Sequence, residues 1–64
     1  MNAALAAGAP QVFQPDVAHW PDNLCSFEAF ASIEVGRKHY PEVPEDNWVA
    51  IDEAAIQDAE VFES

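Results

Sequence analysis

Basic residues are nearly missing from this sequence. It has two, Arg37 and Lys38, against 12 Asp and Glu, which gives a formal net charge of −10 at pH 7. Because a phosphate backbone is held by clustered Lys and Arg, this deficit excludes direct binding of DNA or RNA. Self-repulsion of this size also opposes compaction, so we expect the charge to serve a cationic partner surface.

Metal-binding and redox residues are equally scarce. The single cysteine, Cys25, excludes an internal disulfide and a cysteine-based zinc site, and it fits a reducing compartment. His19 and His39 are the only imidazoles, and no motif gives them the spacing of metal ligands. No glycine follows Pro44, so the acidic second half contains no EF-hand loop. We therefore expect neither a metal nor a cofactor.

The sequence also lacks the arrangements expected of an enzyme or a membrane protein. Cys25 has no evident oxyanion loop or substrate pocket, and adjacent carboxylates such as Glu45 and Asp46 would point in different directions on a helix. The Ala-rich start has no basic segment, and Gly8 and Pro10 interrupt it too early for a signal peptide or a membrane span. We expect a non-enzymatic protein of the cytoplasm.

Aromatic and apolar residues, by contrast, are sufficient for a small fold. Half of the 64 residues are hydrophobic, and they include two Trp, four Phe and one Tyr. Such a chain can bury a core but has marginal stability because of its size. We expect a tail over residues 1–10 and a single acidic domain, which we expect to be monomeric, over residues 11–64.

Three prolines, Pro10, Pro15 and Pro21, indicate an extended first third, with a short strand possible at 11–14 and one turn near 16–20.

In the middle segment, the spacing of apolar residues from Leu24 to Val35 favours a helix over about 22–38. Its candidate N-caps are Asp22 and Asn23, and its stop signals are Gly36 and Pro41. The alternation of apolar residues from Ala29 to Val35 supports a competing strand at about 30–35.

The last third predicts a second helix over about 45–62. Pro44 suits its start, and one apolar stripe at steps of three and four residues contains Trp48, Ile51, Ala55, Ala59 and Phe62. The alternative is a strand at 48–51 followed by a shorter helix capped by Asp52. The predicted fold is therefore mainly α with two helices, and the alternative is α+β with a small sheet.

On the long helix the acidic residues would form rows. Asp46, Glu53 and Glu60 are seven residues apart and would lie on nearly one face, while Glu45, Asp52 and Glu63 would form a second row. With Asp58, the charges would span about 27 Å, or one per about 4 Å, close to the roughly 3.4 Å between phosphates of one DNA strand. A solvated face normally carries Lys and Arg among its acids, so their absence favours a binding surface over a device for solubility.

The sequence thus yields two sets of candidate residues. The predicted partner-binding residues are Glu45, Asp46, Asp52, Glu53, Glu60 and Glu63, with Glu42 and Asp58 as secondary candidates. The predicted core residues are Trp20, Leu24, Phe27, Phe30, Trp48, Ile51, Ala55 and Phe62.

Two classes of function remain open. In the first, the protein is an inhibitor whose carboxylates occupy a basic cleft that normally holds nucleic acid. In the second, it is an acidic interaction module, such as an antitoxin or an accessory subunit, that docks through Trp and Phe. Strong salt dependence of binding would indicate the first class, and weak dependence the second.

The chain is small and acidic, and its aromatic middle runs into residues 40–48, Tyr-Pro-Glu-Val-Pro-Glu-Asp-Asn-Trp. In these features it resembles the small anti-CRISPR proteins of phages and mobile elements. The chain is most similar to their acidic, DNA-mimicking members, which block the Cascade surveillance complexes of type I systems, type I-C among them. These proteins share no motif, so no residue's role is carried over. The resemblance implies a bacterial cytoplasmic setting, no catalysis, and as target the basic site where a Cascade subunit reads the motif that flanks its DNA target.

Overall fold

A four-stranded sheet organises the chain, in place of two long helices. The computed structural model describes residues 10–64, and the tail expected over residues 1–10 lies outside them except for Pro10. The described elements are the strands β2 (Gln11–Pro15), β3 (Glu28–Phe30), β4 (Trp48–Asp52) and β5 (Glu60–Phe62), the helix α1 (Ile33–His39), and three single 3-10 turns, η1 (Val17–His19), η2 (Glu45–Asn47) and η3 (Glu53–Ala55). The fold is α+β, so the mainly α prediction is wrong and its stated alternative is right.

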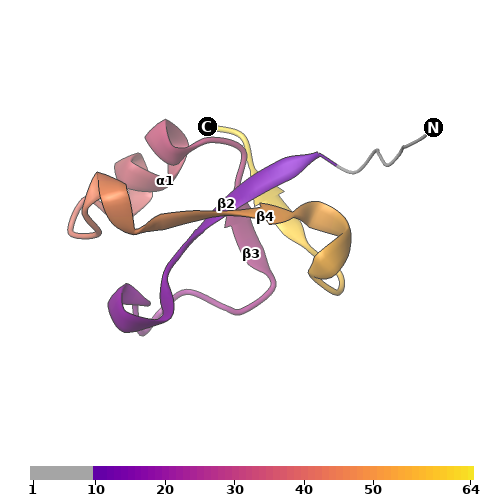
Figure 1. Ribbon diagram of the computed structural model, residues 1–64, viewed down its shortest axis with the longest axis horizontal. Helices are drawn as coiled ribbons and strands as arrows, with labels where there is room; N and C mark the ends of the chain where they lie inside the picture. The colour runs from indigo at the N-terminus through magenta and orange to yellow at the C-terminus, as the bar shows by residue number, and fades with distance from the viewer. Residues whose placement is uncertain (1–9) are drawn as a thin grey trace.

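The strands are ordered β4-β2-β3-β5 (Figure 1). β2 runs antiparallel to both of its neighbours, and β3 pairs with β5 in parallel. Strands that are far apart in the sequence therefore lie side by side, with Phe13 opposite both Phe30 and Ala50. β4 and β5 form the two edges of the sheet.

The first third agrees with what its prolines predict. β2 occupies the place of the expected short strand, and η1 provides the expected turn after it. Pro15 lies opposite Trp48, and the flanking bond from Asp16 N to Asn47 O, of 2.8 Å, places Pro15 at a non-hydrogen-bonded position of the ladder. The proline therefore costs no hydrogen bond to β4.

The helix predicted over 22–38 is replaced by a turn, strand β3 and the shorter helix α1. Ser32 caps α1, because its hydroxyl accepts the N–H of Val35 at 3.1 Å, whereas Asp22 and Asn23 lie in a turn before β3. The basic residues Arg37, Lys38 and His39 lie in the last turn of α1, where the charges of Arg37 and Lys38 complement the carbonyl end of the helix.

The helix predicted over 45–62 is absent from the described chain. The start predicted for this helix is also the start of the single 3-10 turn η2, which begins with Glu45 and Asp46. The following residues form β4, because aromatic and β-branched side chains suit a strand and β2 supplies the partner. Asp52 then caps η3, since its Oδ1 accepts the N–H of Ala54 at 3.0 Å. This arrangement is close to the alternative of a strand followed by a helical segment capped by Asp52.

The main core lies between α1 and one face of the sheet. Leu24, Phe30, Val43 and Trp48 form a buried cluster, and the apolar side chains of α1 pack against it. Of the predicted core, Leu24, Phe30 and Trp48 are buried and Trp20, Ile51 and Phe62 are half-buried. Phe27 and Ala55 are exposed, so these two predictions are wrong, and the buried residues Val12, Ala29 and Val43 were not predicted.

The second face of the sheet is covered as well. Val12 and Ala29 are buried although they point away from the face that carries Phe13 and Phe30. Gln14, on the same side, is the one buried polar residue of the described chain, and its amide nitrogen donates to Ser26 O at 3.1 Å and to Glu28 O at 2.7 Å. The side chain thus takes over hydrogen bonding where the β2–β3 ladder ends, which ties the 21–27 loop to the sheet.

Candidate functional site

The six predicted partner-binding residues lie on four segments of the fold. Glu45 and Asp46 begin η2, and Asp52 and Glu53 lie where β4 passes into η3; we call these four the β4 acids. Glu60 begins β5 and Glu63 follows it, and we call these two the β5 acids. The rows at seven-residue spacing required a long helix, so that geometry is wrong.

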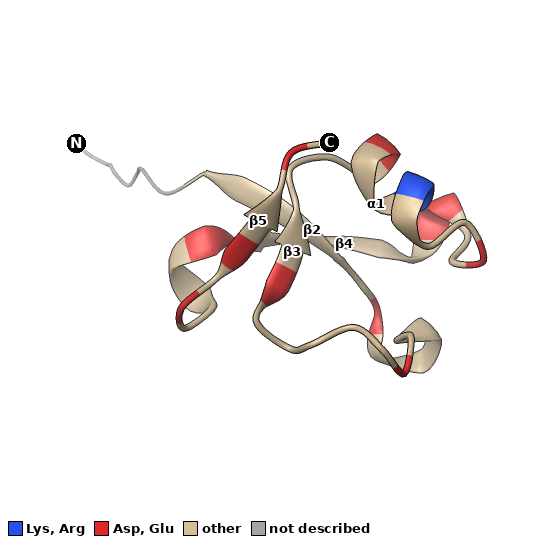
Figure 2. Ribbon diagram, turned by 180° about the vertical axis from the view of Figure 1, so that it is seen from behind, with Lys and Arg blue, Asp and Glu red and all other residues tan. Residues whose placement is uncertain are grey.

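The strand order separates the two groups of acids. Because β2 and β3 lie between the edge strands, the β4 and β5 acids belong to opposite edges, about 14 Å apart at a strand spacing of about 4.8 Å. Figure 2 shows the acidic segments on β3, on β5 and around both ends of the sheet, with the basic segment on α1. The β4 acids therefore lie at the two ends of one strand, two before it and two where it passes into η3, and they are the larger of the two groups.

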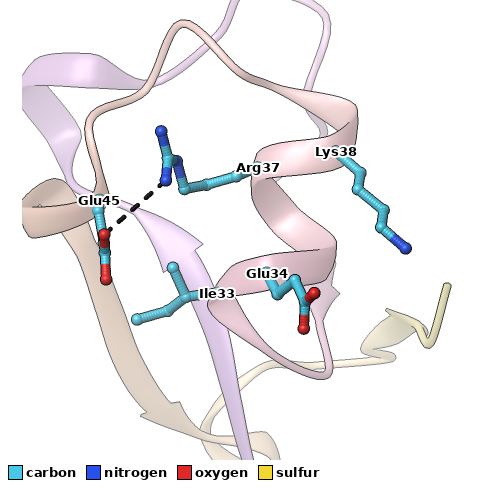
Figure 3. Close-up of a pocket in the computed structure, with 5 residues that line it drawn as sticks. All are labelled: Ile33, Glu34, Arg37, Lys38 and Glu45. Carbon is cyan, nitrogen blue, oxygen red and sulfur yellow. Dashed lines mark ion pairs between the residues drawn. The ribbon is translucent and has the colours of Figure 1, made fainter.

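The candidate carboxylates are accessible and poorly neutralised. Five of the six residues are exposed, and Glu53 is half-buried. Among the described residues, the single ion pair that involves Arg or Lys joins Arg37 Nη1 to Glu45 Oε1 at 3.8 Å (Figure 3). Such an exposed pair contributes little, about 0–1 kcal/mol. The protein thus presents carboxylates whose charge remains available to a partner.

Glu28 is an acidic neighbour that the sequence reasoning missed. It lies directly opposite Glu60 in the parallel ladder of β3 and β5, so two carboxylates share one row of the sheet. One carboxylate oxygen of Glu28 is already hydrogen-bonded, because its Oε1 accepts the N–H of Cys25 at 2.8 Å. No signal in the local sequence joins these residues, since the pairing connects segments that are distant in the chain.

A hydrogen-bonded cluster around Asp16 joins η1 to η2. Asp16 Oδ1 accepts the N–H of His19 at 2.9 Å and lies 2.7 Å from His19 Nδ1, while Asp16 Oδ2 accepts the side-chain N–H of Asn47 at 2.8 Å. The bonds from His19 and Asn47 hold the pKa of Asp16 below its ordinary value. The cluster fixes the turn that leads into β4 and so positions Glu45 and Asp46.

Replacing Asp16 with alanine is expected to destabilise the protein in a pH-dependent way. A carboxyl whose pKa is lowered by folding contributes stability above its unfolded-state pKa and loses that contribution as pH falls through the folded value. The difference in unfolding free energy between the wild type and Asp16→Ala should therefore be largest near neutral pH and shrink below about pH 4. Urea titrations from pH 7 to pH 2 measure it.

Asp22→Ala is the matched control for this titration, because Asp22 is an exposed carboxylate in the loop after η1. We expect its effect on unfolding free energy to be small. A pH-independent loss for Asp16→Ala would show that the carboxylate charge contributes nothing to the cluster.

An open hollow of about 430 Å³ lies beside α1, lined by Ile33, Glu34, Arg37, Lys38 and Glu45. In Figure 3 Arg37 reaches across it towards Glu45, whereas the Lys38 side chain extends away from Glu45. Ligand pockets are usually enclosed and mostly apolar, and this hollow has mixed charges and a single apolar side chain. It is better described as the place where the basic end of α1 meets one of the β4 acids.

The described residues provide little for other chemistry. Across residues 10–64, no group of three His, Cys, Asp or Glu is placed to hold a metal ion. Cys25 is exposed, and the His39 ring packs against Phe30 and Phe62 with centroid separations of 5.4 and 5.5 Å. No helix in the described part of the chain has the length and apolar character needed to cross a lipid bilayer.

No protein family, curated protein or solved structure matches this chain. The function is therefore inferred from the geometry and charge of the surface.

Proposed function

We propose that this protein is an acidic inhibitor that binds a basic protein cleft in place of nucleic acid. The observation that carries the proposal is the exposure of the β4 and β5 acids on a chain with only two basic residues. Lysines and arginines arranged for phosphates also accept carboxylates, and opposite fields speed the encounter. The β4 acids are the principal contact residues in this proposal.

The alternative of a module that docks through Trp and Phe is less well supported. Phe30 and Trp48 are buried at 1% and 7% exposure, and Phe13, Trp20 and Phe62 pack against the same cluster. Phe27, 40% exposed, is the one aromatic residue among the large exposed hydrophobic side chains of residues 10–64. Most aromatic surface therefore stabilises the fold and is not available to a partner.

The resemblance to DNA-mimicking anti-CRISPR proteins gives the proposal a specific target. In this form of the proposal, the protein acts as a monomer in the bacterial cytoplasm, without cofactor or catalysis. It occupies the site where a type I Cascade subunit reads the motif that flanks the DNA target. Type I-C Cascade is the first complex to test.

The direct test is competition between this protein and target DNA for purified type I-C Cascade at several salt concentrations. We expect DNA to be displaced at low salt, and we expect the affinity of the protein for Cascade to fall steeply as salt is added. Failure to displace DNA at low salt would rule out this target. Binding that changes little with salt would favour the accessory-module alternative.

Two charge-reversal variants test where on the surface the contact lies. Asp46→Lys changes a β4 acid, and Glu60→Lys changes a β5 acid; both residues are exposed and both variants have the same net charge. We expect Asp46→Lys to weaken Cascade binding by about tenfold or more, the equivalent of about 1.4 kcal/mol, and Glu60→Lys to weaken it less. Equal losses would mean that net charge, and not the β4 acids, determines binding.

A further inference from the structure

β4 is an edge strand whose outward backbone groups are unpaired within the described chain. In an antiparallel ladder, hydrogen-bonded and non-hydrogen-bonded residue pairs alternate. The bonds from Asp16 N to Asn47 O and from Glu53 N to Pro10 O, of 2.8 and 2.9 Å, fix this alternation. Val49 and Ile51 therefore direct their N–H and C=O groups towards β2, and Ala50 directs both of its groups outwards.

The neighbouring outward groups extend this free edge. The C=O of Trp48 and the N–H of Asp52 point the same way as the groups of Ala50, whereas the N–H of Trp48 is bound to Glu45 O. Residues 10–64 supply no hydrogen-bond partner for the four outward groups. From Trp48 to Asp52 they form a row of free backbone groups about 13 Å long, at roughly 3.3 Å per residue, with which another strand can pair.

The two edges of the sheet differ in how they are protected. Proteins usually protect edges with short strands, charged residues, proline or bulges. β5 has three residues and begins with Glu60, so it is protected in this way. β4 has five residues, its one charged residue is Asp52 at its last position, and its Val49 and Ala50 side chains are exposed. β4 is thus the longer and less protected edge, and it is also the edge flanked by the β4 acids.

We propose that the free edge of β4 binds an extended, basic segment of the partner protein as a fifth strand. The occupant is a segment with small or β-branched residues at its centre and Lys or Arg at its two ends. The outward groups of β4 would bind its backbone, Val49 and Ala50 would contact its centre, and the β4 acids would pair with its ends. This inference depends on the proposed function only in requiring a basic partner.

A second copy of the chain fits this edge poorly. Pairing two β4 strands would bring two sets of β4 acids together, and like charges that lie opposite each other destabilise a sheet. With a formal charge of −10 on each chain, association of two copies is also opposed at long range. Charge complementarity therefore selects a cationic strand.

Amide hydrogen exchange measured by NMR on the full chain tests the edge directly. The probe is the peptide Lys-Arg-Val-Thr-Val-Arg-Lys, and the control peptide has Glu at its four basic positions. We expect the Ala50 N–H to exchange quickly in the free protein and at least about tenfold more slowly with the basic peptide, because a bound strand would accept its hydrogen bond. The Val49 and Ile51 N–H groups, already paired with β2, should be protected in both states.

Three results of this experiment would overturn the inference. If the Ala50 N–H is protected in the free protein at all concentrations, the chain already covers its own edge. If protection rises with protein concentration, a second copy is the occupant. If the basic peptide binds without slowing exchange at Ala50, the contact is electrostatic and does not extend the sheet.

Ala50→Pro separates this inference from the proposed function. Proline removes the outward N–H but none of the bonds to β2, and edge strands tolerate it, so circular dichroism and thermal unfolding should show a folded protein. We expect Ala50→Pro to bind the basic peptide about tenfold more weakly, and Ala50→Val, which keeps the N–H, to bind as the wild type does. If Ala50→Pro binds the peptide as the wild type does, the strand pairing is wrong. If the wild type binds the peptide but does not displace DNA from Cascade, only the proposed target is wrong.

Discussion

Replacing Phe30 with alanine is expected to lower the unfolding free energy by about 3–5 kcal/mol. The whole described domain should have only about 3–8 kcal/mol, at roughly 0.05–0.15 kcal/mol per residue. Phe30 is 1% exposed, and its ring lies 5.4 to 5.9 Å from the rings of His39, Tyr40, Trp48 and Phe62. Its loss would leave a cavity that several elements share, so much of the variant should be unfolded at 25 °C.

Urea unfolding followed by far-UV circular dichroism measures this loss. Phe27→Ala is the matched control, since it makes the same chemical change at a residue that is 40% exposed. We expect Phe27→Ala to cost much less, because its side chain gives up less burial. Similar losses for the two variants would contradict the assignment of Phe30 to the centre of the core.

Replacing Gly36 with alanine is expected to destabilise the protein by about 2 kcal/mol or more, although it replaces glycine within a helix. In isolation the change should favour α1 by about 1 kcal/mol. However, a Cβ at position 36 would lie 2.5 Å from Cη2 and 2.6 Å from Cζ3 of Trp48. Overpacking a core typically costs about 1–3 kcal/mol, and a buried indole has little room to move.

A double-mutant cycle with Trp48→Phe tests this explanation. The phenylalanine ring is smaller than the indole, so Gly36→Ala should be neutral or stabilising when Phe occupies position 48. Chemical unfolding of the four proteins gives the coupling energy, which we expect to be about 2 kcal/mol. An equal loss in both backgrounds would mean that the alanine is unfavourable for a reason other than its contact with Trp48.

Features that depend on local chemistry could be predicted from the sequence. The prolines indicated the extended start and the turn after it, and Asp52 was an alternative cap. Exposure of most of the acids also followed from their charge. Each of these properties is determined by residues that are close in the chain.

β3, β4 and β5 were assigned to helices because their pattern is not that of a sheet with one solvated face. Ala29 and Phe30 are adjacent and both buried, since both faces of β3 are covered, so simple alternation is lost. The stripe from Trp48 to Phe62 matched helical spacing although β4, η3 and β5 divide it. A helix over 45–62 would also have held six carboxylates without a cation, and the sheet distributes these charges over several segments.

The candidate surface could be predicted only in part, for a related reason. The residue types were visible, but their division into β4 and β5 acids depends on pairing between distant segments. The free edge at Ala50 depends on the same pairing, because the ladder with β2 decides which backbone groups point outwards.

The order of the strands also has a kinetic consequence. β2 must find β4 across most of the chain, and the bond between Asn47 and Asp16 joins residues 31 positions apart. Topologies dominated by distant contacts close large loops before any stabilising contact forms, so they fold more slowly than helical bundles of equal size. The pairing of β3 with β5 also brings Glu28 opposite Glu60, and we expect added salt to accelerate refolding by screening these like charges.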